Sequence, residues 1–177
     1  MRYQFVHKRN NDWSFEELAV IEKTIAFVNE PTTGDPVMEV GKYLASIISV
    51  KFLIIGRTNL PEADKIDTVC FLNYGKPMPN LTYSLKGTPC QDAYDYGVCY
   101  YPVGVKEEFP NDKDLVEMNI NSYMGTALIN QASETIGLIV LLHDKTISNP
   151  GFIEHLLTLV SPVVEMYLEN KVVQEVH

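Results

Sequence analysis

Two cysteines and two tyrosines near the middle of the chain are the residues whose types best suit chemistry. Cys90 and Cys99 share one segment rich in glycine, proline and tyrosine, which Tyr83 precedes and Tyr123 follows. A cysteine thiol can pack as a small apolar group, act in a redox pair or bind a metal ion, and the sequence leaves these three roles open. A metal site would need further ligands, for which only His143 is an obvious recruit, so we predict no metal.

A helix start beside Cys90 is a second feature that suits a ligand. Gly87 allows a sharp turn, and Thr88 and Pro89 have the residue types of a helix cap and a first helical position. Free backbone N–H groups at such a start suit an anionic or carbonyl ligand, although the same residues are also typical of any capped helix. A helix start can also lower the pKa of a nearby thiol, here that of Cys90.

Tyr83 and Tyr123 each combine an apolar ring with one hydroxyl group. Such side chains can stack on a ligand and hydrogen-bond to it, and they are also common in a partly buried core. Tyr123 precedes Gly125, where the missing side chain would let the chain pass close to a neighbouring segment. The ligand-binding residues that we predict are Tyr83, Thr88, Cys90, Cys99 and Tyr123.

The sequence motifs of well-known enzyme classes are absent. The chain contains no GxxxxGK[ST] phosphate loop, no GxGxxG after a strand, no HExxH and no GxSxG. His143 and His155 stand alone, and a lone histidine is more often structural than a ligand or a base. No histidine lies between Tyr83 and Tyr123 to bind a haem. We therefore predict no catalytic residue, and the sequence identifies no cofactor.

Helices are predicted near both ends of the chain. Ser14 and Glu17 form a capping box, a second helix covers residues 35–49, and Pro150 begins a long helix with a kink at Pro162. The first and last helices carry narrow apolar seams, which suit the pairing of helices in a dimer. The seams consist of Leu18, Ile21, Ile25 and Val28 and of Ile153, Leu157, Val160 and Val164.

Strands are predicted between these helices. They are the apolar or alternating runs 51–58, 67–74, 81–85, 124–130 and 135–142. Residues 136–142 are apolar on both faces, which indicates a central strand that is covered on both sides. The stretch 86–107 is irregular and is the expected binding surface. This order predicts an α+β domain at 14–177, behind a tail at 1–13, with helices on one face of an antiparallel sheet and loops on the other.

Composition excludes several kinds of partner. The chain of 177 residues has a formal net charge of −9, which repels a phosphate backbone, so we predict no nucleic-acid partner. No apolar run reaches the roughly 18–20 residues that span a bilayer, and residues 1–11 lack the apolar core of a signal peptide. Three cysteines without CxxC spacing suit a reducing compartment. We therefore expect a cytoplasmic protein with no membrane partner.

Four motifs follow one another between Tyr83 and Asn130. They read YSLKGTPC, VCYYP, FPND and NSYMGTALIN. In this order and spacing they closely resemble the GAF domains of bacterial sensor histidine kinases and diguanylate cyclases, and the resemblance covers about residues 35–170. It implies a GAF-like antiparallel sheet, end helices packed on one face, and a loop-covered pocket for a small molecule on the other.

The resemblance also implies a regulatory role. We expect a sensory input domain that forms a homodimer and reports through its end helices to a kinase or cyclase effector, in the same polypeptide or in a partner. One alternative is a redox sensor, or an enzyme similar to the free methionine-R-sulfoxide reductases, that uses Cys90 and Cys99. The G-H-x-x-C-D segment of those enzymes is missing here. The other alternative is a structural dimerisation domain with an empty pocket.

Overall fold

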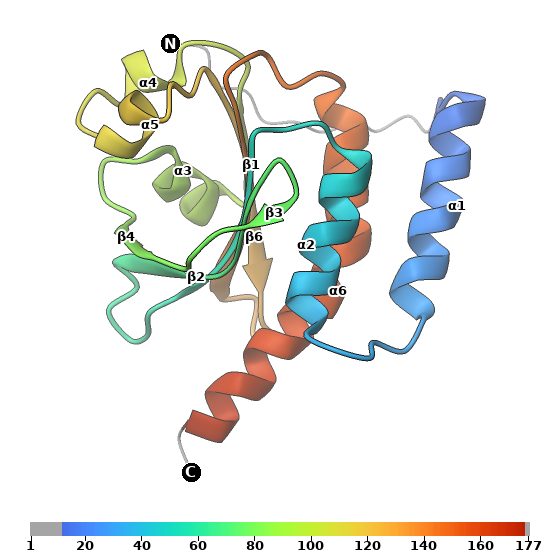
Figure 1. Ribbon diagram of the computed structural model, residues 1–177. Helices are drawn as coiled ribbons and strands as arrows, with labels where there is room; N and C mark the ends of the chain where they lie inside the picture. Colours follow the sequence, from blue (N-terminus) through green and yellow to red (C-terminus); the bar gives the residue numbers. More distant parts are fainter. Residues whose placement is uncertain (1–11, 176–177) are drawn as a thin grey trace.

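The chain forms a twisted sheet with helices on one side and loops with short helices on the other (Figure 1). The computed structural model describes residues 12–175. The helices are α1 (Phe15–Asn29), α2 (Pro36–Ile47), α3 (Pro89–Tyr96), α4 (Val105–Glu108), α5 (Lys113–Glu117) and α6 (Pro150–Glu175). The strands are β1 (Phe52–Thr58), β2 (Lys65–Asn73), β3 (Lys76–Pro77), β4 (Thr82–Ser84), β5 (Val98–Tyr101), β6 (Ser122–Ile129) and β7 (Thr135–His143).

The sheet confirms the predicted α+β class. Its strand order is β3-β2-β1-β7-β6-β5, with β4 also paired to β2, and every pairing is antiparallel. Residues 136–142 of β7 are all buried, so β7 is the predicted central strand covered on both faces. Neighbouring residues of a strand point to opposite faces, so the apolar strands contribute side chains to two separate cores, one on each face of the sheet.

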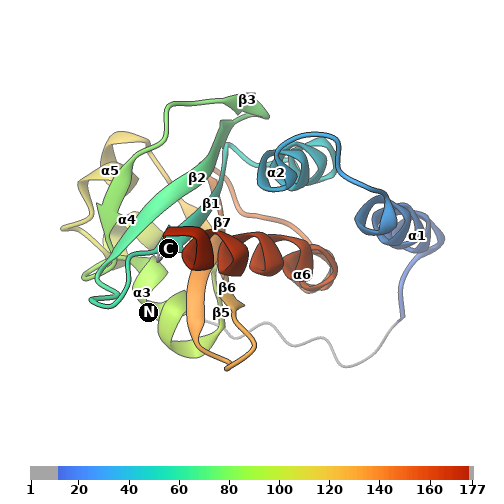
Figure 2. The same ribbon diagram turned by 90° about the horizontal axis from the view of Figure 1, so that it is seen from below.

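The helical layer is two helices deep (Figure 2). Helices α2 and α6 pack on the sheet, whereas α1 packs on α6 and on α2 from outside. The ring of Phe27 stacks on that of Tyr43 with centroids 4.1 Å apart, and the hydroxyl oxygens of Thr24 and Tyr43 are 2.7 Å apart. The apolar seam predicted in α1 is therefore only partly inside, because Leu18 and Ile25 face away from the core and are 45% and 44% exposed.

The first helix begins as predicted. The Ser14 hydroxyl accepts the Glu17 amide N–H at 3.1 Å, and the Glu17 carboxylate accepts the Ser14 amide N–H at 2.8 Å. Residues 1–11 of the predicted tail lie outside the described residues. Trp13 packs against α6, with its ring 5.6 Å from Phe152 and 5.1 Å from His155 between centroids. Ordered packing on α6 therefore starts before the cap.

Helix α6 is a core helix, although the span Pro150–Lys171 is long and apolar enough to cross a membrane by length and composition. The predicted seam of Ile153, Leu157, Val160 and Val164 is fully buried against the sheet. The helix continues through Pro162, and its C-terminal half turns to pass below the lower end of the sheet (Figure 1). That bend agrees with the predicted kink, since a proline inside a helix removes one hydrogen bond.

The stretch 86–107, predicted to be irregular apart from a short helix that starts at Thr88 and Pro89, is regular for much of its length. The stretch contains α3, the edge strand β5 paired with β6, and most of α4. The four residues of β5 are mostly buried on both sides, under α3 and toward the helical layer, so they show no alternation of apolar and polar types. A run this short and without a period gives no strand signal.

Gly41 sets how closely α2 approaches the sheet. A Cβ atom at Gly41 would lie 2.5 Å from the Sγ atom of Cys70 in β2, and Cys70 is fully buried. Real Cβ atoms do not come this close to another heavy atom, so a larger side chain at Gly41 must displace the Cys70 side chain or push α2 outward.

We expect Gly41→Ala to lower the free energy of unfolding in urea by about 1–3 kcal/mol, the usual cost of overpacking a core. This occurs even though alanine favours a helix interior over glycine. Adding Cys70→Ala should recover part of the loss, because it removes the atom that collides. Ser46→Ala, on the exposed side of α2, is the control and should change stability by less than about 0.5 kcal/mol. A stable Gly41→Ala protein would contradict the close packing.

Candidate functional site

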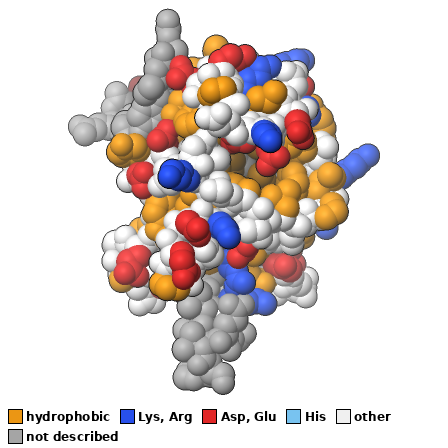
Figure 3. All heavy atoms as spheres, turned by 90° about the vertical axis from the view of Figure 1, so that its left-hand side faces the viewer, with side chains coloured by type: hydrophobic (Ala, Val, Ile, Leu, Met, Phe, Trp, Pro, Cys, Tyr) orange, Lys and Arg blue, Asp and Glu red, His pale blue; other side chains and the backbone are white. Residues whose placement is uncertain are grey.

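A cavity of about 590 Å³ lies on the face of the sheet opposite α2 and α6. Figure 3 looks onto this face, where hydrophobic atoms are visible between scattered charged side chains. The volume is in the range of ligand pockets. The floor consists of alternate residues of β1, β2 and β7: Phe52, Ile54, Phe71, Val140 and Leu142.

Four of the five predicted ligand-binding residues line this cavity, namely Tyr83, Thr88, Cys90 and Tyr123. They come from β4, the start of α3, and β6. These elements meet because the segment between β4 and β6 covers this face of the sheet. The fifth residue, Cys99, is not among the lining residues. It is buried in β5 below α3, where its thiol donates to the carbonyl oxygen of Pro89 at 3.6 Å.

The Cys90 thiol is enclosed by two phenol groups. The hydroxyl of Tyr123 donates to Cys90 Sγ at 3.4 Å, and the hydroxyl oxygen of Tyr83 lies 3.4 Å from the same sulfur. Tyr123 has no exposed surface, and burial raises the pKa values of Tyr123 and Tyr83 well above the ordinary value. Both phenols therefore stay protonated and polar at neutral pH.

The prediction of a lowered thiol pKa at Cys90 is wrong. Burial raises the pKa of Cys90 to about 11, and the hydrogen bonds from Tyr123 and Tyr83 offset only part of this effect. Burial likewise raises the pKa of Cys99. A helix start stabilises a thiolate by less than the loss of water destabilises it when the sulfur is this deeply enclosed. All three cysteines are free thiols.

The start of α3 is built partly as predicted. Thr88 and Pro89 occupy the cap and first helical positions, and Gly87 adopts a left-handed φ of 78° that permits the turn. The Thr88 side chain does not cap the helix, however. Its hydroxyl donates to the carbonyl oxygen of Leu85 at 2.7 Å, and the Gln91 amide N–H donates to the Thr88 carbonyl oxygen.

Gly125 makes room for the Tyr123 ring. A Cβ atom at Gly125 would lie 2.2 Å from the Tyr123 hydroxyl oxygen and 2.9 Å from the Ala93 side chain of α3. The sequence pointed to a close passage here, and the structure shows which groups use the space. The ring of Tyr123 folds along its own strand beneath α3 and so reaches Cys90.

Asp112 is a lining residue that the sequence analysis did not select. It is half-buried at the N-cap of α5, and its Oδ1 atom accepts the Leu115 amide N–H at 3.3 Å. The only available signal was the FPND motif, which predicts a helix cap and gives no indication that Asp112 lines a cavity. The apolar floor was also missed, because a strand's sequence does not show which face is left open.

No metal centre is evident among residues 12–171, where no group of three or more histidine, cysteine and acidic side chains could hold an ion. His143, the one recruit considered for the cysteines, is at the end of β7 and does not line the cavity. Its Nδ1 atom lies 3.3 Å from an oxygen of the adjacent Asp144.

Comparison with known proteins identifies the fold. No family model matches the sequence, and no curated protein matches it. The chromophore-binding domain of phytochrome P1 from Stigmatella aurantiaca superimposes with a TM-score of 0.64 and 10% identity, over 90% of this chain and 62% of that one. This chain thus spans less than two thirds of the phytochrome structure.

Two smaller structures match over nearly their whole length. The nlh2 GAF domain of A. aeolicus has a TM-score of 0.58 and 14% identity, over 88% of this chain and 97% of that one. The free methionine-R-sulfoxide reductase of Neisseria meningitidis, solved with its substrate, has a TM-score of 0.65 and 15% identity, over 93% and 95%. At such identities the likeness concerns the fold alone, and this chain has a GAF-like fold.

The raised pKa of Cys90 predicts a pH dependence of stability. The folded state holds the Cys90 proton up to pH about 11, whereas the unfolded chain loses it near the ordinary pKa of 9.0. The contribution of the protonated thiol to the stability of the fold is therefore complete below pH 9 and is lost as the pH rises toward 11. One such group lowers the free energy of unfolding by about 1.4 kcal/mol per pH unit across this window.

Urea unfolding between pH 8 and pH 11 tests this expectation. Tyrosines and the other cysteines contribute to the absolute slope, so the comparison is between the wild type and Cys90→Ala. The variant should lose stability less steeply above pH 9, by about one proton per molecule. Equal slopes for the two proteins would mean that the Cys90 thiol is open to water in the native state.

Proposed function

We propose that this domain is a sensory input module that binds a small molecule in the cavity and reports its presence through α1 and α6. The observation that carries the proposal is the cavity of about 590 Å³ with an apolar floor and a small set of convergent polar groups. The receiver would be an effector such as a histidine kinase or a diguanylate cyclase, in the same polypeptide or in a partner, located with this domain in the cytoplasm.

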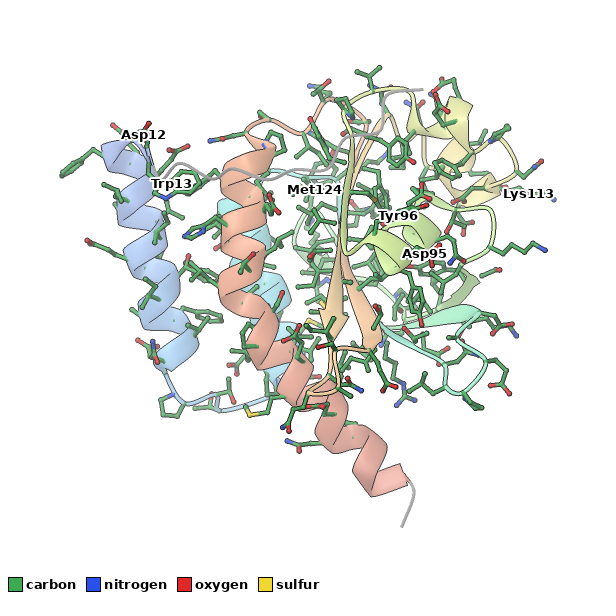
Figure 4. All side chains as sticks on the ribbon, turned by 180° about the vertical axis from the view of Figure 1, so that it is seen from behind. Asp12, Trp13, Asp95, Tyr96, Lys113 and Met124 are labelled. Carbon is green, nitrogen blue, oxygen red and sulfur yellow. The ribbon has the colours of Figure 1, made fainter. Side chains whose placement is uncertain are left out.

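Strand β6 supports a route from the cavity to the helices. Tyr123 on one face lines the cavity, and Met124 and Leu128 on the other face belong to the core beneath α2 and α6. Figure 4 shows Met124 on the helical side of the sheet, with Asp95 and Tyr96 of α3 on the other. A ligand that displaces Tyr123 would therefore disturb the packing of α6.

The end of β6 is also tied directly to α6. The carboxylate of Glu165 accepts the Ile129 amide N–H at 2.9 Å, and that of Glu169 accepts the Gln131 amide N–H at 2.9 Å. A hydrogen bond to a charged group contributes more than a neutral one. Movement of β6 and movement of α6 are therefore coupled, which is what a change of population between two helix arrangements requires.

The thiol chemistry favours a binding domain over an enzyme. A reductase or redox sensor of the kind considered above needs a thiolate, and burial raises the pKa values of Cys90 and Cys99 far from neutrality. The structural likeness to a methionine-R-sulfoxide reductase extends to the fold and does not supply the missing G-H-x-x-C-D segment. We therefore propose no catalytic activity for this chain.

We further propose a homodimer that pairs through α1. On the face of α1 away from α6, Phe15 is 86% exposed, and Leu18 and Ile25 continue the same stripe at helical spacing. Part of the apolar seam predicted in α1 is thus available to a second copy, whereas the seam of α6 is buried against the sheet.

Mass spectrometry of small molecules released from the purified, denatured protein, together with a thermal-shift screen, tests the proposed ligand binding. For a ligand found in this way, we expect Tyr123→Ala to weaken binding by ~1–3 kcal/mol in calorimetry, because a buried aromatic contact is lost. Tyr123→Phe is the matched control and retains the ring. Equal affinity for wild type and Tyr123→Ala would place the ligand elsewhere, and no ligand at all would favour a structural domain.

Light scattering at ~100 μM, above the dissociation constants of ordinary homodimers, should give a dimer. Leu18→Glu with Ile25→Glu should convert it to a monomer, since the change places charges in the exposed stripe. Lys23→Glu makes the same change in net charge on another side of α1 and should leave the dimer intact. A monomeric wild type would contradict the homodimer, and dimerisation of the double variant would contradict the surface.

A further inference from the structure

Asp112 is the carboxylate that distinguishes this cavity from a purely apolar one. It is half-buried, whereas the other charged lining residues, Lys86, Lys113 and Asp114, are exposed at the rim. Lys113 lies at the outer edge of the molecule (Figure 4). The carboxylate of Asp112 accepts backbone N–H bonds at the start of α5, from Leu115 at 3.3 Å and from Asp114, which is an ordinary cap arrangement and leaves acceptor capacity for another partner.

Asp112 has no counter-charge of its own. Among residues 12–171, no lysine or arginine forms an ion pair with it. Burial raises the pKa of its carboxyl group, and the neighbouring Asp114 raises it further, while only backbone hydrogen bonds lower it. A half-buried carboxylate without a cation is costly, so a positive group that enters the cavity would find a favourable partner.

The remaining surface of the cavity suits the apolar body of such a ligand. Phe52, Phe71 and Tyr83 present aromatic rings, and a cation near an aromatic face gains additional attraction. The hydroxyl of Tyr123 is already directed at Cys90, so it offers little to an anion. The net charge of −9 also raises the local concentration of cations relative to anions.

We propose that the cavity binds an amphipathic organic cation, with an apolar, preferably aromatic body on the strand floor and a protonated amine paired with Asp112. This inference rests on the proposed function and names the chemical class of its ligand. It differs from the anionic or carbonyl ligand that the start of α3 suggested, because Thr88 and Gln91 use that turn for bonds within the chain. The exposed rim lysines are screened by water, whereas Asp112 is not fully screened.

Three probes of one shape test the charge preference. Tryptamine carries a cation, tryptophol is its neutral analogue, and indole-3-propionate is its anionic analogue. Calorimetric titration of the wild type at pH 7 should give an affinity for tryptamine at least about tenfold higher than for tryptophol, as expected for one charge-assisted hydrogen bond. Indole-3-propionate should bind more weakly than tryptophol.

Asp112→Asn is the decisive variant because asparagine caps a helix as well as aspartate does, so the fold is retained. It should reduce the affinity for tryptamine about tenfold and leave that for tryptophol unchanged. Asp114→Asn removes the same charge at the rim and should change the tryptamine affinity less than about threefold, because an exposed charge is screened.

The outcomes separate this inference from the proposed function. Binding of tryptophol or indole-3-propionate as tightly as tryptamine, or an equal loss in Asp114→Asn, overturns the cation preference and leaves a ligand-binding cavity in place. Failure of all three probes to bind overturns the cation preference as well. If the denatured protein also releases no small molecule and the thermal-shift screen finds none, the proposed function falls with it.

Discussion

The strands β1 and β7 are buried on both faces, and this requirement determines the rest of the architecture. A sheet with two apolar faces has to be covered twice, so one layer comes from α2 and α6 and the other from the segment between β4 and β6. The two layers differ in kind. Helix α2 packs so closely on β2 that a Cβ atom at Gly41 would collide with Cys70, whereas the short helices and turns on the other face leave a cavity against the sheet.

Glycines at three places allow neighbouring segments to approach closely. Gly41 brings α2 onto β2, Gly125 holds the Tyr123 ring under α3, and Gly137 passes so close to the backbone of β1 that a Cβ atom would lie 2.4 Å from the Gly56 carbonyl oxygen. Gly125 in β6 faces α3 on the cavity side, and Gly137 in the neighbouring strand β7 faces α6 on the helical side. The packing that shapes the cavity and the packing that seats the helices are thus connected through two central strands, β7 and β6.

Features set by local chemistry could be predicted from the sequence. The capping box of Ser14 and Glu17 and the strand runs that became β6 and β7 depend on neighbours in the chain. The motif around Tyr83, Cys90 and Tyr123 led to four residues of the cavity. Features set by tertiary burial could not. They include the strand β5, the position of Cys99 behind α3, the raised pKa of Cys90 and the place of Asp112 in the cavity lining.

The three thiols lie in different parts of the two cores and can therefore report on each layer separately. Cys70 is enclosed on the helical side, and Cys90 and Cys99 are enclosed on the cavity side. Cys90 lines the cavity, whereas a cysteine-directed reagent can reach Cys70 or Cys99 only when the layer above it opens, since burial keeps both of these sulfurs protonated and out of water. The alkylation rates of Cys70 and Cys99, followed by peptide mapping, would therefore measure how often the layer above each of them opens, without any engineered probe.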